Sequence, residues 1–169
     1  YLGVGTVCGG GPCPPNYNGI VLNEIRLDQT GTDTDEYVEI AGPAGASLNG
    51  LTYIVVGDGA AAAGSGVIES IVDLSGRIIP ADGHFLIALD NSTFGAAADM
   101  IATLTFENSD NVTHMLVSGF RGNEDQDLDT DNDCALDANP PWVGEVDRVA
   151  FLETTNPPTV DPPTTIPPT

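Results

Sequence analysis

The stretch His84-Phe-Leu-Ile-Ala-Leu89 indicates the fold of this chain most directly. Its apolar side chains at Phe85, Ile87 and Leu89 recur at every second residue. This is the period of a β-strand that buries one face and exposes the other. The same period recurs at Met115 and Val117, and at Val149 and Phe151. The pattern therefore predicts strands rather than helices.

On both sides of this stretch, short runs rich in Val, Ile, Leu and Phe alternate with turn residues such as Gly, Pro and Asp. Runs of this composition and length favour β-strands. The expected strands are residues 20–27, 36–41, 51–57, 67–74, 84–89, 100–106, 112–118 and 145–152. Many short strands separated by turns predict an all-β fold, an antiparallel β-sandwich, with a barrel as the alternative.

Two extensions of different composition flank the expected sandwich of residues 20–153. Residues 1–19 form a Gly/Pro-rich leader, in which residues 1–7 could form a strand exchanged with a neighbouring molecule. Residues 154–169 repeat a Pro-Pro-Thr unit, which favours polyproline II and a stiff linker or stalk. The alternative is that this tail docks on a neighbouring molecule.

The charge is strongly negative, because 25 acidic residues face four basic ones and leave a net charge of −21. Such a field repels nucleic acid and attracts cations. No run reaches the roughly 20 apolar residues of a membrane span, so we expect no membrane insertion. Excess acid alone indicates only solubility, and a cation site needs local support.

Cysteine and asparagine positions suggest an oxidising compartment outside the cell. Cys8 and Cys13 close a tight Cys-Gly-Gly-Gly-Pro-Cys loop, and we predict a disulfide between them. Cys134 is then free or bonded between chains, whereas a rival pairing joins it to the leader. Asn91-Ser-Thr and Asn111-Val-Thr are candidate glycosylation sites. We expect an extracellular or cell-surface location.

The acidic loop of residues 124–137 carries seven acids and no base. Alternating carboxylates at this density repel one another unless a cation or water screens them. Their spacing, Asp-x-Asp-x-Asp-x-x-x-Asp, is typical of calcium loops, in which carboxylates surround a hard cation. The predicted Ca²⁺ ligands are Asp129, Asp131, Asp133 and Asp137, with Asp127 replacing Asp137 if the register shifts by two residues.

Two departures separate this loop from a strict EF-hand. Cys134 occupies the position where the pattern has Gly, and Pro140 occupies the position of the bidentate Glu. No helix signal flanks the loop. It is similar instead to the loops of dockerins and thrombospondin type 3 repeats. The alternative is a solvated acidic loop without an ion.

Four segments resemble the bacterial lamin tail domain family. They are Ile20-Val-Leu-Asn-Glu-Ile, Asp35-Glu-Tyr-Val-Glu-Ile, Leu48-Asn-Gly-Leu-Thr-Tyr-Ile-Val-Val and Ile79-Pro-Ala-Asp-Gly-His-Phe-Leu-Ile. The resemblance covers about residues 20–153 and leaves out the leader and the tail. It implies an immunoglobulin-like β-sandwich that is not itself catalytic. Such domains occur in bacterial secreted and surface proteins, sometimes beside nuclease or phosphatase domains.

No catalytic motif stands out in the sequence, and we expect the chain not to be an enzyme. It contains no Gly-x-Ser-x-Gly turn, no phosphate-binding Gly-x-x-x-x-Gly-Lys loop and no His-Glu-x-x-His. His84 and His114 are expected at strand surfaces or edges, and Glu36 is expected to be a solvated strand residue. Trp142, the sole tryptophan, is expected to close an edge of the core.

Taken together, the sequence predicts a non-catalytic extracellular structural module that calcium stabilises. Its expected partners are copies of itself, in a surface fibre or array, or another surface protein. The leader and the tail are the segments expected to make these contacts. The alternative function is an accessory domain of a secreted nuclease or other hydrolase.

Overall fold

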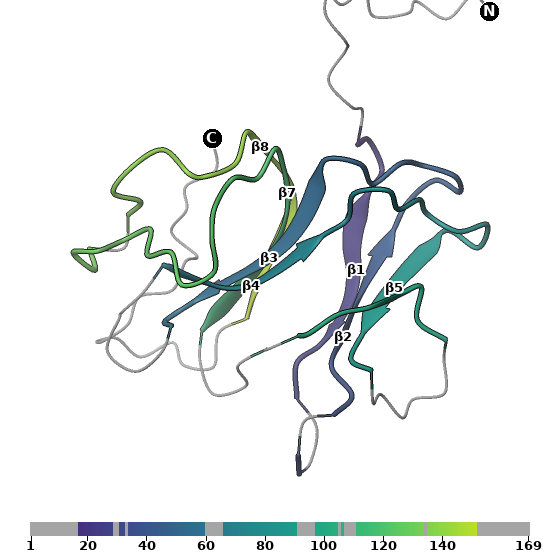
Figure 1. Cartoon of the computed structure of the whole chain (residues 1–169), viewed down its shortest axis with the longest axis horizontal. Coiled ribbons are helices and arrows are strands. Elements are labelled where there is room, and N and C mark those ends of the chain that lie inside the picture. Colours follow the sequence, from purple (N-terminus) through teal and green to yellow (C-terminus); the bar gives the residue numbers. More distant parts are fainter. Residues whose placement is uncertain are drawn as a thin grey trace, which may run out of the picture.

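The computed structural model describes residues 17–28, 31–32, 34–59, 66–90, 97–104, 106, 111–133 and 135–151. In these ranges the chain forms eight β-strands (Figure 1). The strands are β1 (Val21–Arg26), β2 (Tyr37–Ala41), β3 (Leu51–Gly57), β4 (Val67–Asp73), β5 (His84–Ala88), β6 (Met100–Ile101), β7 (Val112–Ser118) and β8 (Gly144–Phe151). The described residues contain no helix, and thus none long and apolar enough to cross a membrane.

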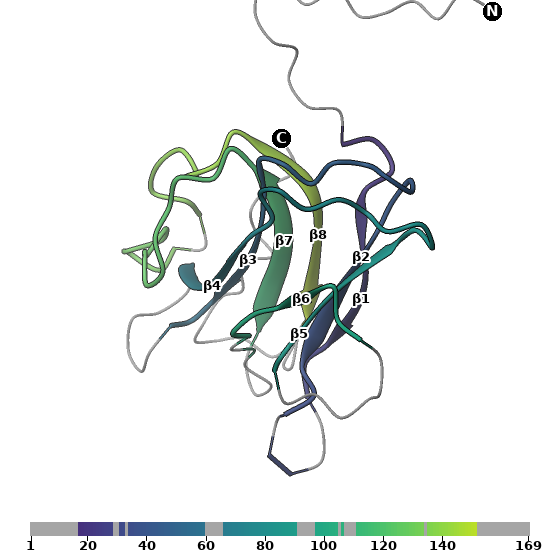
Figure 2. The same cartoon turned by 45° about the vertical axis from the view of Figure 1, so that its right-hand side comes forward.

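The strands form two four-stranded sheets with the orders β1-β2-β5-β6 and β4-β3-β7-β8. Neighbouring strands are antiparallel except for β5 and β6, which pair in parallel through two residues. The two sheets face each other, as the turned view in Figure 2 shows. The predicted all-β sandwich, antiparallel in nearly all its pairings, is therefore confirmed.

Prediction and structure agree best in the two central strands of the second sheet. Strands β3 and β7 have the predicted bounds, whereas the strand expected at 100–106 ends after Ile101. Leu104 and Phe106 are nevertheless buried, because they lie where the chain crosses from one sheet to the other and cover the core. The strand expected at residues 1–7 lies outside the described residues.

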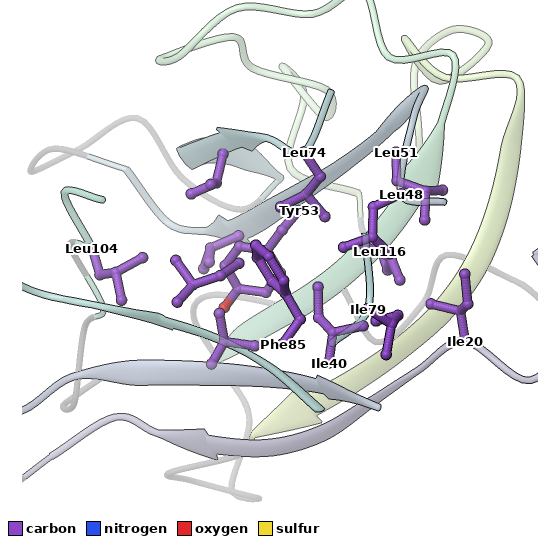
Figure 3. Close-up of a cluster of buried hydrophobic side chains, with 14 of the residues drawn as sticks. Ile20, Ile40, Leu48, Leu51, Tyr53, Leu74, Ile79, Phe85, Leu104 and Leu116 are labelled. Atoms are coloured by element: carbon purple, nitrogen blue, oxygen red, sulfur yellow. The ribbon is translucent and has the colours of Figure 1, made fainter. Parts of the chain in front are cut away.

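The main core lies between the sheets and takes alternate side chains from both (Figure 3). Ile40 and Phe85 come from the first sheet, and Tyr53 and Leu116 come from the second. Alternation along each strand points these side chains inward, as expected for packed sheets. Each fully buried apolar side chain stabilises the fold by about 1.5–3 kcal/mol relative to exposure. This core holds the sandwich together.

On one side of the sandwich the edge strands of the two sheets meet, because β1 contacts β8. The amide of Leu22 on β1 donates to Oδ2 of Asp147 on β8 at 2.8 Å. An edge amide of one sheet is therefore satisfied by a carboxylate of the other. This contact closes part of a sandwich edge that would otherwise offer unpaired backbone groups.

A second apolar cluster lies on the outer face of the β4-β3-β7-β8 sheet. Its buried members are Ile54, Val56, Ile68, Met115, Val117 and Leu128. Phe120, Leu136 and Trp142 are partly buried against it, so the expectation that Trp142 closes an edge of a core is confirmed. The segment between β7 and β8, residues 120–142, supplies these covering side chains. We call this segment the cover and the apolar group the second cluster.

Candidate metal centre

The acidic loop is the central part of the cover, and backbone hydrogen bonds attach it to the outer edge of β4. The amide of Asp125 donates to the carbonyl of Ile68 at 2.8 Å, and the amide of Ile68 donates to the carbonyl of Gln126 at 3.0 Å. The amide of Leu128 donates to the carbonyl of Gly66 at 3.0 Å. Residues 125–128 therefore extend one end of the sheet beyond β4. This pairing fixes the position at which the rest of the acidic loop starts.

Leu128 and Asp129 mark the point at which the loop turns from the apolar cluster to its acidic part. Leu128 packs into the second cluster at 8% exposure, and Asp129 beside it is only 3% exposed. Gly66 allows Asp129 to lie this close to the backbone before β4. A Cβ on Gly66 would lie 2.9 Å from Cβ of Asp129, and its φ of +83° is in the left-handed region that favours glycine. A buried carboxylate is thus held against the sheet.

Side-chain to backbone hydrogen bonds shape the loop after Asp129. Oδ1 of Asp129 accepts from the amide of Asp133 at 3.1 Å, and Oδ1 of Asp133 accepts from the amide of Ala135 at 3.0 Å. The chain turns between them at Asn132, whose φ is +54°. Asparagine tolerates this conformation better than most residues do. The turn folds the loop back on itself.

The loop closes where Asp137 returns to the segment of residues 128–130. The amide of Asp137 donates to the carbonyl of Leu128 at 2.9 Å. Oδ2 of Asp137 accepts from the amide of Thr130 at 2.7 Å and also from the Thr130 hydroxyl. Asp137, eight residues beyond Asp129 in the sequence, therefore lies close to it in space.

This closure brings three carboxylates together. Asp129, Asp131 and Asp137 each offer an oxygen, and these oxygens lie within 4.8 Å of one another. They are three of the four aspartates in the main predicted ligand set. Asp133 and the alternative ligand Asp127 do not belong to this group. Oδ1 of Asp127 instead accepts from the amide of Asp129 at 2.9 Å, so the loop geometry favours the register that uses Asp137.

The electrostatics of the three carboxylates differ. The pKa of Asp131 is raised, chiefly by the negative charge of Asp133, with smaller effects of desolvation and of Asp137. The pKa of Asp137 is lowered, because the Thr130 side chain and amide both donate hydrogen bonds to it. Asp131 thus carries a charge that its surroundings disfavour. A cation among the three oxygens would reverse this effect, because an opposite charge favours the ionised carboxylate.

Several other predicted site residues lie outside the described residues: Cys8, Cys13, Cys134 and Asn91. Asn111 is described and lies directly before β7 at 9% exposure. Thr113 of the same triplet is buried at 1% exposure. The folded sandwich therefore holds this glycosylation candidate inside rather than presenting it at the surface.

His114 corrects an expectation. It was expected at a strand surface or edge, but it is fully buried in the main core, where Nδ1 is hydrogen-bonded to the hydroxyl of Tyr53. Phe106 and Phe151 approach its ring edge-on, with centroids 4.9 and 5.4 Å away. Met115 and Val117 suggested that only their own face of β7 is buried. Both faces are buried, because the cover lies over one and the other sheet over the opposite one.

Burial also sets the protonation of this pair. The pKa of His114 is lowered to about 3 by desolvation, so the imidazole is neutral at physiological pH. The pKa of Tyr53 is raised, first by burial and second by the negative charge of Glu36. Glu36, expected to be solvated, is itself buried at 5% exposure. The sequence signal for this polar group was a histidine followed directly by three apolar residues, Met115, Leu116 and Val117.

His84, by contrast, lies where it was expected. It begins β5 and is exposed, and its Nδ1 lies 3.0 Å from Oε1 of Glu39 on the neighbouring strand.

Comparison with known proteins adds nothing to these observations, because no family model, curated protein or solved structure matches this chain. The site must be interpreted from its own geometry.

Proposed function

We propose that this chain is a non-catalytic structural module of the cell surface or extracellular space, and that Ca²⁺ stabilises its acidic loop. The observation that carries the proposal is the convergence of Asp129, Asp131 and Asp137 at one point of a loop docked on the sheet. Because Leu128 of the same loop lies in the second cluster, an ion held there would also stabilise apolar packing.

The donor chemistry supports calcium over other divalent cations. All three groups are carboxylates, which are hard oxygen donors, and the described part of the loop contains no histidine that would favour zinc. Ca²⁺ accepts six to eight oxygens in flexible geometry, whereas Mg²⁺ demands a regular octahedron. An irregular loop with one buried and two exposed carboxylates fits the more flexible ion. We expect a dissociation constant of roughly 0.1–1 mM, typical of extracellular modules.

Titration calorimetry on chelator-treated protein tests this site. The wild type should bind Ca²⁺, and the Asp129→Asn/Asp131→Asn double variant should bind it at least about ten times more weakly. Asp82→Asn is the control, because it makes the same Asp→Asn change outside the acidic loop. Asp82 is an exposed turn residue whose carboxylate accepts a hydrogen bond from the amide of His84. Equal calcium uptake by the wild type and the double variant would show that the assignment is wrong.

The proposal includes membership of the lamin tail family, with an immunoglobulin-like form of the sandwich. Three of the four resembling segments contribute to β1, β2 and β5, which are adjacent in one sheet. The fourth, residues 48–56, contains most of β3 of the other sheet. Each motif therefore corresponds to one strand of the sandwich, which supports the proposed family.

We further propose that copies of this chain assemble into a fibre or array. The edges of β1 and β8 meet, but among the described residues only the 125–128 segment pairs with the outer edge of β4, and only at its beginning. The rest of β4 and the two-residue β6 are sheet edges at which a strand from a neighbour could add. Residues 1–7 are the proposed added strand, and residues 154–169 a second contact.

Removal of residues 1–7 or of residues 154–169, followed by ultracentrifugation and electron microscopy, tests the assembly. The full chain should polymerise with calcium present, and each shortened chain should stay monomeric. A head-to-tail contact between different surfaces does not close and therefore gives filaments. A full chain that stays monomeric at high concentration would contradict the proposal, as would shortened chains that still polymerise.

A further inference from the structure

We propose that the cover, residues 120–142, lifts from the sheet as a unit while the sandwich stays folded. Repulsion among the carboxylates of the cover favours the lifted state, and cations favour the closed state. Lifting exposes the second cluster on the outer face of the β4-β3-β7-β8 sheet. The part of this inference that concerns calcium rests on the proposed function, whereas the lifting itself does not.

The two ends of the cover are joined at its base. The amide of Val143 donates to the carbonyl of Ser118 at 2.9 Å, and the amide of Arg121 donates to the carbonyl of Pro141 at 2.7 Å. These bonds continue the β7–β8 ladder past its last paired residues, Ser118 and Gly144. The cover can therefore leave the sheet while β7 and β8 remain paired.

In the described part of the chain, few backbone bonds hold the far part of the cover to the sheet. Three such bonds join Asp125, Gln126 and Leu128 to the beginning of β4. Among the described side chains of the cover, Leu128 alone is buried in the second cluster, whereas Phe120, Leu136 and Trp142 are only partly buried. Segments with few buried contacts and short ladders open locally at lower free energy than core strands.

The charge of the cover opposes its closure. It carries seven acids and a single base, Arg121, which is exposed at the base of the cover and not among the aspartates. Closing the loop brings oxygens of Asp129, Asp131 and Asp137 within 4.8 Å of one another, where their negative charges repel. Salt screens such repulsion between exposed groups, and a bound cation removes more of it.

The surface beneath the cover is apolar. Ile54 and Val56 of β3 and Met115 and Val117 of β7 are all fully buried, and they lie side by side in the second cluster. Lifting the cover would expose these four apolar side chains to solvent together. Cation concentration would thereby control whether this face of the sandwich is available.

Hydrogen exchange followed by mass spectrometry on the intact wild-type chain tests the lifting directly. Without calcium and at low salt, amides of residues 123–137 should exchange at least about a hundred times faster than those of β3 and β7. Raising sodium chloride should slow exchange in the cover and leave β3 and β7 unchanged. Protection of the cover equal to that of β3 and β7, lost only when the whole domain unfolds, would overturn the proposal.

A pair of leucine substitutions separates local from global opening. Leu128→Ala should speed exchange in the cover at least about ten-fold and increase binding of an apolar dye, with β3 and β7 still protected. Leu104→Ala removes the same side chain from the main core and should weaken protection in the strands. Trp142, the sole tryptophan, reports the movement through its fluorescence. Equal effects of the two variants on the strands would also overturn the proposal.

The calcium arm distinguishes this inference from the proposed function. If calorimetry detects calcium binding and exchange in the cover slows, both stand. Binding without any slowing would overturn the coupling between ion and cover and leave the calcium site intact. If calcium does not bind, the proposed function fails, and the sodium chloride series still decides whether the cover lifts.

Discussion

Acid should destabilise this protein through one buried histidine. His114 is fully buried, and its neighbours Phe106 and Phe151 offer its ring no ion partner. Burial lowers its pKa from 6.5 to about 3. The folded state therefore binds fewer protons at this group than the unfolded state does. Above pH 6.5 His114 does not lower the free energy of unfolding. As pH falls from 6.5 towards 3, protonation of His114 in the unfolded state lowers this free energy progressively.

The size of the effect follows from these two pKa values. Each unit of pH well inside that window removes about 1.4 kcal/mol from the free energy of unfolding. Between pH 7 and pH 5 the loss from His114 alone is about 2 kcal/mol, most of it below pH 6. This is a sizeable fraction of the roughly 5–15 kcal/mol by which domains are stable.

Denaturant unfolding at pH 7 and pH 5 measures the loss, and a double variant isolates the histidine. Tyr53→Phe/His114→Phe removes the titrating group together with its hydrogen-bond partner, so the Tyr53 hydroxyl is not left buried without its acceptor. All other titrating groups are common to both proteins. The wild type should lose about 2 kcal/mol more than the double variant over this interval. Equal losses in the two proteins would show that His114 is not the source of the acid sensitivity.

Two further substitutions test local features of the fold. Gly66→Ala should destabilise the protein by about 2 kcal/mol and weaken calcium binding, since the new Cβ meets Asp129 at a positive φ. Gly76→Ala has a similar φ with no atom within 4 Å and should cost less, so equal thermal shifts for the two variants would exclude the contact with Asp129 as the cause. Asp147→Ala should lower stability by about 1–2 kcal/mol, because the amide of Leu22 loses its acceptor. An unchanged unfolding midpoint would show that this contact between β1 and β8 contributes nothing.

The strands were predictable where composition and period agree. Residues 51–57 and 112–118 are rich in β-branched and large apolar side chains, and the structure gives strands with those bounds. The prediction of a strand at 100–106 is confirmed only for Met100–Ile101, and Leu104 and Phe106 are buried outside the strands of the described residues. Burial in a crossover needs only contact with the core and leaves no two-residue period. The composition of the segment could not distinguish the two cases.

The cover was the feature least visible in the sequence. Its apolar members Phe120, Leu128, Leu136 and Trp142 follow no strand or helix period, so nothing local indicates that they share one surface. The aspartate spacing identified three residues that converge, because a compact loop is a local structure. The burial of Asp129 and of His114 depends on chain segments distant in sequence, and these could not be predicted from the pattern alone.

The most direct test of the calcium site is a crystal structure of the protein grown with millimolar CaCl₂, with the ion identified by its anomalous signal. We expect one ion bound by oxygens of Asp129, Asp131 and Asp137 at about 2.3–2.6 Å, with further carbonyl or water oxygens completing the shell. A structure in which these three carboxylates bind only water, or in which the ion lies elsewhere on the chain, would contradict it.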